Sequence, residues 1–337
     1  MKKIGKNEKN YGIAILRVLL SFMVVLDHFY NKKKKKKFTY LLYYHIPTFF
    51  FMSFYYTYYY FTTFNIHKIK IRFERLAIPY FFWSFIAFIK NNIYFFLFKR
   101  KSSHTFKIFV ENLLNGHILV VPLWFQNILI LTTLIISIIV FLFKNDYLLI
   151  FQFLMILSYK FQYSGDNYRF CKKHFSVHYK LTYGRFFETF PDSLTGFFIG
   201  MFEIPNKLKL YKLRTIISCI LIIIFISKYH YYDKFLGFKY GGIRKNIAAI
   251  FIFLFFFLTL NKLRNTKIKK ILDIITNYTP GIYFIHTILG SGYIMKYCLN
   301  NKIETIFGCF ILYLISYFCC FFLDKLIGNT KLKHIIK

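Results

Sequence analysis

Three side chains that can do chemistry interrupt the first long apolar run of this sequence, residues 11–30: Arg17, Asp27 and His28. Arg17 and His28 are eleven positions apart, which on a helix is three turns plus about 20°, so both side chains lie on one side, with Ser21 between them. Their depths differ by roughly 16 Å. Inside lipid, such a polar stripe is expected to face protein or a water-filled cavity. The alternative interpretation is that both charged residues extend to opposite membrane surfaces.

Two arginines, Arg72 and Arg75, precede the third apolar run in the segment KIRFERLAIPYFF. If this segment is helical, residues three apart share a face. Two guanidinium groups near a membrane surface suit a phosphorylated ligand, because each can bind phosphate through two parallel hydrogen bonds. The competing hypothesis is that they are ordinary flanking charges that set the topology.

Polar residues also open the fourth apolar run, PLWFQNILI. Gln126 and Asn127 are costly inside a membrane unless they are hydrogen-bonded, so we expect both to face the protein interior. Trp124 fits an anchor at the membrane interface.

Further polar pairs lie in two later runs. Glu188 and Asp192 are four residues apart and are expected to share a helix face. Acidic groups at membrane depth are candidates for function, although pairing with Arg185 or placement among the headgroups explains them equally well. Tyr283 and His286 share a face near the end of the chain. For His286 a buried, hydrogen-bonded role is favoured over a catalytic one.

The composition places these residues in a membrane protein. The chain is 57% hydrophobic and 23% aromatic, with a mean hydropathy of +0.43, whereas soluble domains are about 45–50% apolar. The net charge of +34 lies in short clusters between apolar runs. Such clusters are typical of loops that face anionic lipids, which argues against a nucleic-acid partner. The six cysteines show neither zinc-type spacing nor a disulfide framework, so no metal is expected.

Ten apolar runs approach or exceed the length of a membrane span. They predict an all-α fold, a polytopic transmembrane helix bundle of about ten spans. One integral-membrane domain is expected over residues 1–337, with the motifs in residues 11–323. Basic residues divide equally between the two sides of the membrane, and omitting Lys32–Lys37 leaves an excess on the side of the termini, which predicts cytoplasmic termini. The spans are expected near 12–30, 40–64, 76–98, 122–143, 147–159, 184–203, 213–229, 246–261, 279–297 and 304–323.

The order of these features resembles the acyltransferase-3 family, polytopic bacterial enzymes that acylate sugars and polysaccharides. Arg17 and His28 have the spacing of the family's first-span motif, and FPDSLTGFFIG is similar to its mid-chain span. The chain departs from the family at Phe54, where a glycine is expected after serine. The other matching segments are Arg72 and Arg75 followed by Pro79 and Tyr80, then Leu123, Trp124 and Phe125, and finally Gly281, Ile282, Tyr283 and His286.

This resemblance implies an acyltransferase of the bacterial inner membrane, surrounded by membrane lipids. It would move an acyl group, usually acetyl, from acyl-CoA to a hydroxyl of a cell-surface or lipid-linked carbohydrate, with acetyl-CoA as donor and no metal. His28 is expected to take the hydroxyl proton, because an imidazole ordinarily has a pKa near 6.5. Asp27, if oriented toward His28, would favour the imidazolium that forms, and Arg17 would hold the pantetheine arm or position the chamber. Arg72 and Arg75 are expected to hold the CoA phosphates. Candidates for the substrate site are Glu188, Asp192, Trp124, Gln126, Asn127, Tyr283 and His286.

Two other hypotheses belong to different classes. A transporter or flippase of lipid-linked saccharide would also bury polar residues, but it is expected to show broken helices in two related halves. The sequence shows no such repeat. A decayed enzyme is the third hypothesis, suggested by Phe54 and by the Lys32–Lys37 run.

Overall fold

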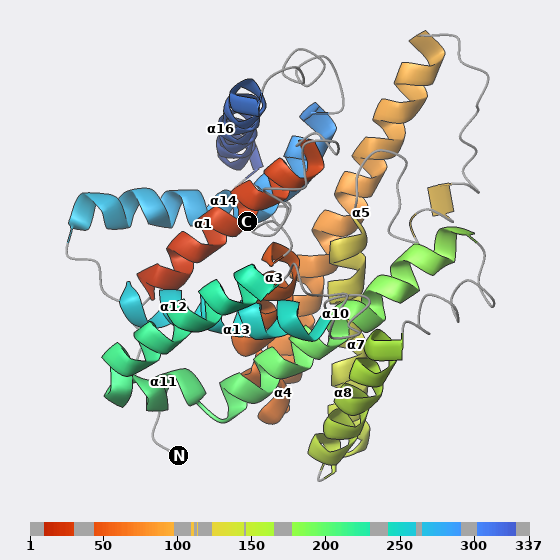
Figure 1. The fold of residues 1–337 in the computed structure, drawn as a ribbon. Helices are drawn as coiled ribbons and strands as arrows, with labels where there is room; N and C mark the ends of the chain where they lie inside the picture. Colours follow the sequence, from red (N-terminus) through yellow and green to blue (C-terminus); the bar gives the residue numbers. More distant parts are fainter. Residues whose placement is uncertain are drawn as a thin grey trace.

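The computed structural model describes residues 10–29, 44–97, 109–110, 113, 123–144, 146–164, 177–229, 242–260, 265–290 and 302–327. Every regular element in these ranges is helical (Figure 1), which confirms the all-α prediction. The helices are α1 (Tyr11–Phe29), α3 (His45–Tyr55), α4 (Tyr58–Thr62), α5 (Ile66–Leu97), α7 (Trp124–Leu142), α8 (Tyr147–Ser164), α10 (Val177–Met201), α11 (Ile204–Leu208), η2 (Lys209–Tyr211), α12 (Lys212–Tyr229), α13 (Gly242–Thr259), α14 (Thr266–Gly290) and α16 (Lys302–Ile327).

Three helices among the described residues are long and apolar enough to cross a membrane, within Tyr11–His28, Trp124–Leu142 and Ile306–Ile327. Two shorter apolar stretches are Tyr147–Ser158 and Lys245–Thr259. The prediction of about ten spans is therefore not confirmed. Charged and polar side chains interrupt other long helices such as α10 and α14, which lowers their mean hydropathy.

The predicted span 40–64 is not one continuous helix in its described part. A break after α3 separates it from the short helix α4 (Tyr58–Thr62). Phe64 follows with φ of 51°, in the left-handed region that bulky residues rarely enter. Asn65 then caps the start of α5, because its Oδ1 accepts a hydrogen bond from the Lys68 N–H at 3.0 Å. The chain thus passes from α4 into α5 at Phe64 and Asn65, where the predicted span ends.

Prolines lie inside α5, α10 and α14. A proline has no N–H, so the carbonyl four residues earlier loses its usual partner. In α14 that carbonyl belongs to Thr276, four residues before Pro280, and the Thr279 hydroxyl donates to it at 2.9 Å. A neighbouring side chain thus satisfies the backbone, as membrane helices require.

Two glycines bring α10 directly against α3. A Cβ on Gly196 would lie 2.1 Å from the carbonyl oxygen of Phe51, and one on Gly200 would lie 2.9 Å from that of Tyr55. The four-residue spacing is the small-residue pattern that lets membrane helices approach closely. Because both contacts advance by four residues in the same direction, α10 and α3 run parallel.

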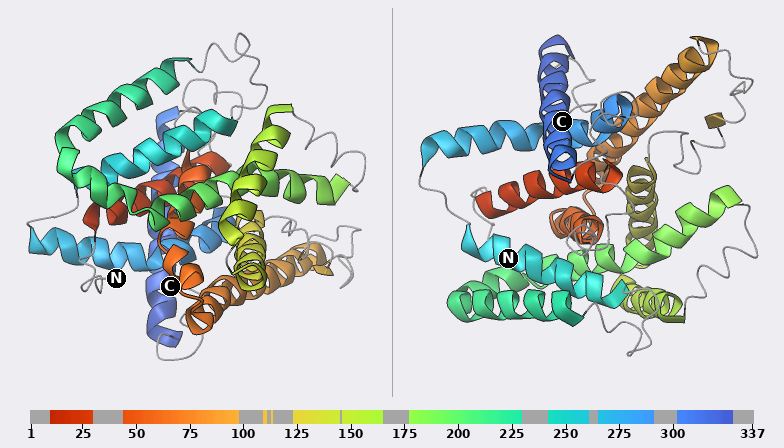
Figure 2. Two further views of the ribbon diagram at one scale, coloured as in Figure 1. Left: turned by 90° about the horizontal axis from the view of Figure 1, so that it is seen from below. Right: turned by 45° about the horizontal axis from the view of Figure 1, so that its top comes forward.

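Helix α1 lies between α14 and α16 on one side and α3 and α13 on the other (Figures 1 and 2). Asn10 caps its start, since the side-chain Oδ1 accepts a hydrogen bond from the Ile13 N–H at 3.3 Å. The Asn10 amide also donates to the Phe257 carbonyl at 3.0 Å. A Cβ on Gly12 would lie 1.8 Å from the Phe256 carbonyl oxygen. The beginning of α1 is therefore fixed against the end of α13.

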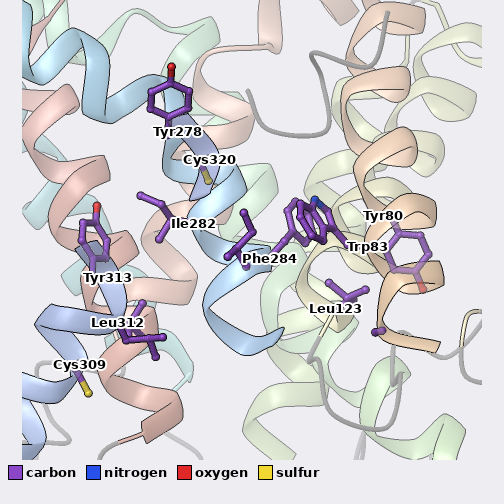
Figure 3. Packing of buried hydrophobic residues seen from close by; sticks show 13 residues of the cluster. Tyr80, Trp83, Leu123, Tyr278, Ile282, Phe284, Cys309, Leu312, Tyr313 and Cys320 are labelled. Atoms are coloured by element: carbon purple, nitrogen blue, oxygen red, sulfur yellow. The ribbon is translucent and has the colours of Figure 1, made fainter. Parts of the chain in front are cut away.

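A second part of the core joins α5, α14 and α16 (Figure 3). The rings of Trp83 and Phe284 stack, with centroids 6.1 Å apart and an angle of 12° between planes. Tyr313 of α16 forms a hydrogen bond with Ser21 of α1, with 2.9 Å between the two oxygens. The first contact joins α14 to α5, and the second holds α16 against α1, which carries the polar stripe.

Candidate active site

The polar stripe of α1 is buried in its middle and exposed at its two ends, Arg17 and His28. Ser21 is buried and bound to Tyr313, and Val24, one turn nearer to His28, is also buried. At the end of the stripe the His28 ring meets a ring of α14, that of His286. The middle of the stripe therefore faces protein, whereas its two ionisable residues remain accessible.

His28 and His286 form an edge-to-face pair with ring centroids 5.3 Å apart and planes at 73°. His286 is fully buried, and its Nδ1 lies 2.8 Å from the carbonyl oxygen of Ile282. Since a carbonyl only accepts, Nδ1 carries the proton, and Nε2 of the neutral ring is an acceptor. His28 is exposed. An accessible imidazole thus lies beside a buried one whose tautomer is fixed by its own helix.

A series of aromatic contacts extends from this pair to two further helices. Tyr283 lies 6.1 Å from the His286 ring and 5.5 Å from the ring of Phe125 on α7, measured between centroids. Phe125 in turn lies 5.8 Å from Phe49 on α3. Trp124 packs edge-to-face on Phe125. Four candidates from distant parts of the sequence, among them both histidines, therefore gather where α1, α3, α7 and α14 meet.

Gln126 faces the interior, as expected, but its amide is engaged with protein. Its Nε2 donates to the Leu76 carbonyl of α5 at 3.1 Å. This carbonyl lies in the turn before Pro79, whose ring and missing N–H disturb the helix. Gln126 thus ties α7 to α5, whereas its neighbour Asn127 is half-buried.

Arg17 lies near the other end of α1 from the histidine pair. Its side chain is exposed and interacts electrostatically with Tyr56, the residue that follows α3. The eleven-residue separation from His28 corresponds to roughly 16 Å along the helix. Asp27, next to His28 in sequence, is partly buried.

Arg72 is buried, 8% exposed, and bonded to protein. Its Nη1 and Nη2 donate to the carbonyl and hydroxyl oxygens of Ser53 at 3.3 and 3.0 Å, and its Nε donates to the Thr133 hydroxyl at 3.2 Å. The guanidinium also lies 4.7 Å from the centroid of the Phe54 ring. Arg75 is exposed. The two arginines, expected to act together, therefore meet different surroundings: Arg72 fixes the end of α3, and Arg75 is accessible.

Asp192 is 1% exposed and lies on the α10 stripe that also carries Gly196 and Gly200. That stripe packs on α3. Because the helices are parallel, Asp192 is one turn nearer to the N-terminal end of α3, whose positive dipole end favours a carboxylate. Glu188 belongs to α10, but its side chain lies outside the described residues.

One buried histidine is not among the candidates taken from the sequence. His45 is 3% exposed and is the first residue of α3. In the sequence, His45 is the first residue of the apolar segment HIPTFFF, and no motif singles it out. In the part of the chain that the structure describes, no three His, Cys, Asp or Glu side chains are arranged to hold a metal ion.

A family model described as an acyltransferase domain matches residues 10–325. This match spans nearly the whole chain and includes every candidate residue discussed above. No curated protein and no solved structure matches the chain significantly.

Proposed function

We propose, since the chain belongs to the acyltransferase-3 family, that it acylates carbohydrate. The family and the apolar helices make it a membrane acyltransferase. The proposal adds the two substrates: acyl-CoA, with acetyl as the simplest acyl group, and a hydroxyl of a cell-surface or lipid-linked saccharide. The membrane concerned would be the bacterial inner membrane.

The main structural support for this proposal is the contact between the rings of His28 and His286. His286, with Nδ1 bound to the Ile282 carbonyl, has an Nε2 that can accept an N–H from His28. Such a bond would direct the other nitrogen of His28 toward substrate, as the third group of a catalytic triad orients its base. An accessible imidazole held in one orientation suits general base catalysis.

The reaction then needs two proton transfers, one to His28 and one from it. His28 takes the proton of the acceptor hydroxyl while its oxygen attacks the thioester carbonyl and a C–O bond forms. The C–S bond breaks as the carbonyl re-forms, and His28 returns the proton to the CoA sulfur. The neighbouring Asp27 carboxylate, partly buried, would stabilise the positive charge that His28 carries between these steps.

The donor would extend along α1 between Arg17 and His28. Arg17 is exposed and lies roughly 16 Å from His28, where it can meet the pantetheine arm or a phosphate. Arg75 is the accessible member of the second arginine pair. Its guanidinium suits a CoA phosphate, while Arg72 holds α3 in place.

Basic side chains near the start of α1 support entry of the donor from the cytoplasm. Lys269 of α14 lies 5.6 Å from the Tyr11 ring centroid, and Lys209 of η2 lies 5.3 Å from that of Phe257. Arg17 is close to the same end of the bundle. Since basic residues concentrate on the cytoplasmic side of membrane proteins, we place this end in the cytoplasm, where CoA is found.

The test is transfer from labelled acetyl-CoA to membrane glycan by purified protein. His28→Ala and His28→Gln should each lose about 10²–10⁴-fold in rate, because neither side chain can take a proton, while affinity for CoA is retained. His67→Gln is the matched control, since His67 is an exposed histidine of α5, and it should keep the native rate.

Near-native transfer by His28→Ala would exclude His28 as the base. Absence of labelled product with the native protein, over a range of acceptors, would contradict the proposed substrates.

A further inference from the structure

We propose that Tyr313 of α16 and Ser21 of α1 form a latch over the path of the acyl donor: the latch opens when the pantetheine arm of CoA enters, and the Tyr313 hydroxyl then binds an amide of the arm. This inference rests on the proposed function. Arg17 and His28 are exposed, whereas Ser21 and Val24 between them are buried. A donor that reaches from Arg17 to His28 must therefore uncover the middle of the stripe.

A hydrogen bond from α16 covers the Ser21 hydroxyl. Ser21 has a single hydroxyl proton, which it donates to the Val18 carbonyl at 2.8 Å. The Tyr313 hydroxyl, 2.9 Å away, is therefore the donor to the Ser21 oxygen. Tyr313 is 7% exposed and lies beside α1 (Figure 3). Because this bond joins two neutral hydroxyls, its net contribution to stability is small, and a ligand that offers a carbonyl can replace it.

Helix α16 is placed so that it can move away from α1. Within the described part of the chain it packs mainly on α1 and α14, at the edge of the bundle (Figures 1 and 2). Its opposite face carries Phe307, Phe318 and Phe322, each more than half exposed. A small tilt of α16 therefore uncovers Ser21 without displacing a helix behind it.

The lengths of the pantetheine arm and of the stripe agree. An extended chain advances about 1.1–1.2 Å per bond, and the second amide carbonyl of the arm is about eight bonds from the sulfur, the first phosphorus about thirteen. With the sulfur at His28, these groups lie roughly 9–10 Å and 14–16 Å away. Along α1, Ser21 is roughly 10 Å and Arg17 roughly 16 Å from His28. The amide thus reaches the latch, and the phosphate reaches Arg17.

Opening the latch exchanges one hydrogen bond for another. The Tyr313 hydroxyl donates to Ser21 in the closed form and to the amide carbonyl of the arm in the open form, so the number of hydrogen bonds is kept. Only the open form takes the arm, and the affinity for CoA is therefore reduced in proportion to the fraction of protein that is open. Weakening the latch should tighten CoA binding, a result that the loss of a merely structural contact would not give.

The experiment measures the Kd and the association rate of CoA with the purified full chain. Ser21→Ala removes the acceptor of the latch and keeps the Tyr313 hydroxyl for the arm, so its Kd should fall about 2–10-fold. Tyr313→Phe removes the same bond and should speed association by a similar factor. It should bind CoA more weakly than Ser21→Ala, because it lacks the hydroxyl.

Ser316→Ala is the matched control. Ser316 is buried on the same helix, and its hydroxyl donates to the Leu312 carbonyl of that helix at 2.8 Å. This variant should bind CoA with the native Kd and association rate.

The latch is excluded if Ser21→Ala binds CoA no more tightly than the native protein, or if Tyr313→Phe associates with CoA at the native rate. The second measurement decides the matter if Ser21→Ala does not fold. The contact with the arm is excluded if Tyr313→Phe binds CoA as tightly as Ser21→Ala. Failure of the proposed function is a separate result, because it would leave the native protein itself without CoA binding or transfer.

Discussion

Arg72 and Arg75 offer a sharp test of the structure because they are the same residue type, three positions apart on one helix, in opposite surroundings. Arg72→Ala removes a buried guanidinium that donates to Ser53 twice and to Thr133 once. It leaves the hydroxyl oxygens of Ser53 and Thr133 without this donor and uncovers the Phe54 ring, which is fully buried. The Ser53 carbonyl keeps the hydrogen bond that the Thr57 hydroxyl donates at 2.7 Å.

The expected cost follows from these contacts. Each buried acceptor left unsatisfied costs about 1–3 kcal/mol, and the cation–π contact adds roughly 0.5–2 kcal/mol. Removing the buried charge also relieves its desolvation cost, so we take the lower limit for two acceptors and the cation–π contact, about 2.5 kcal/mol. At about 2–4 °C per kcal/mol, this corresponds to a fall in Tm of roughly 5–10 °C.

Arg75→Ala removes the same charge from an exposed position and should change stability by no more than about 0.5 kcal/mol. The assay is thermal unfolding of both variants purified in one detergent, with CoA affinity measured in parallel. Arg75→Ala should instead weaken CoA binding. Equal Tm values for the two variants would refute the buried contacts of Arg72, and unchanged CoA affinity of Arg75→Ala would reduce that residue to a topology signal.

Two further predictions concern packing and topology. Gly196→Ala places a Cβ 2.1 Å from the Phe51 carbonyl oxygen, so α10 and α3 must separate by about 1 Å, at a cost of about 1–3 kcal/mol. A displacement of that size can lower the rate of acyl transfer by about 10²-fold. Ser193→Ala, on the same helix, is the control and should change neither stability nor transfer. A native Tm for Gly196→Ala would contradict the close contact. Reporter fusions at the C-terminus should be active in the cytoplasmic form only, and activity of the extracytoplasmic reporter would reverse the proposed entry side for the donor.

The local features of this protein could be predicted from sequence because they depend on the chain alone. The lengths of the apolar runs identified a membrane protein. Helical periodicity put Arg17 and His28 on one stripe, since a shared helix face follows from residue spacing. The order of motifs indicated the family that the match over residues 10–325 confirms. The break at Tyr56 and Thr57 marks where this approach failed, because composition does not reveal that the predicted span 40–64 divides into α3 and α4.

The arrangement of the candidate site was decided by tertiary structure. Periodicity put Arg72 and Arg75 on a common face, but the helices packed against α5 decide which of the two is buried. Ser53 and Thr133 accept hydrogen bonds from Arg72. The pairing of His28 with His286 joins residues from opposite ends of the chain, which spacing cannot foresee. The sequence by itself determined which residues share a helix face; only the packing of α1 against α3 and α14 decided which faces meet, because such contacts depend on shape and close approach between distant segments.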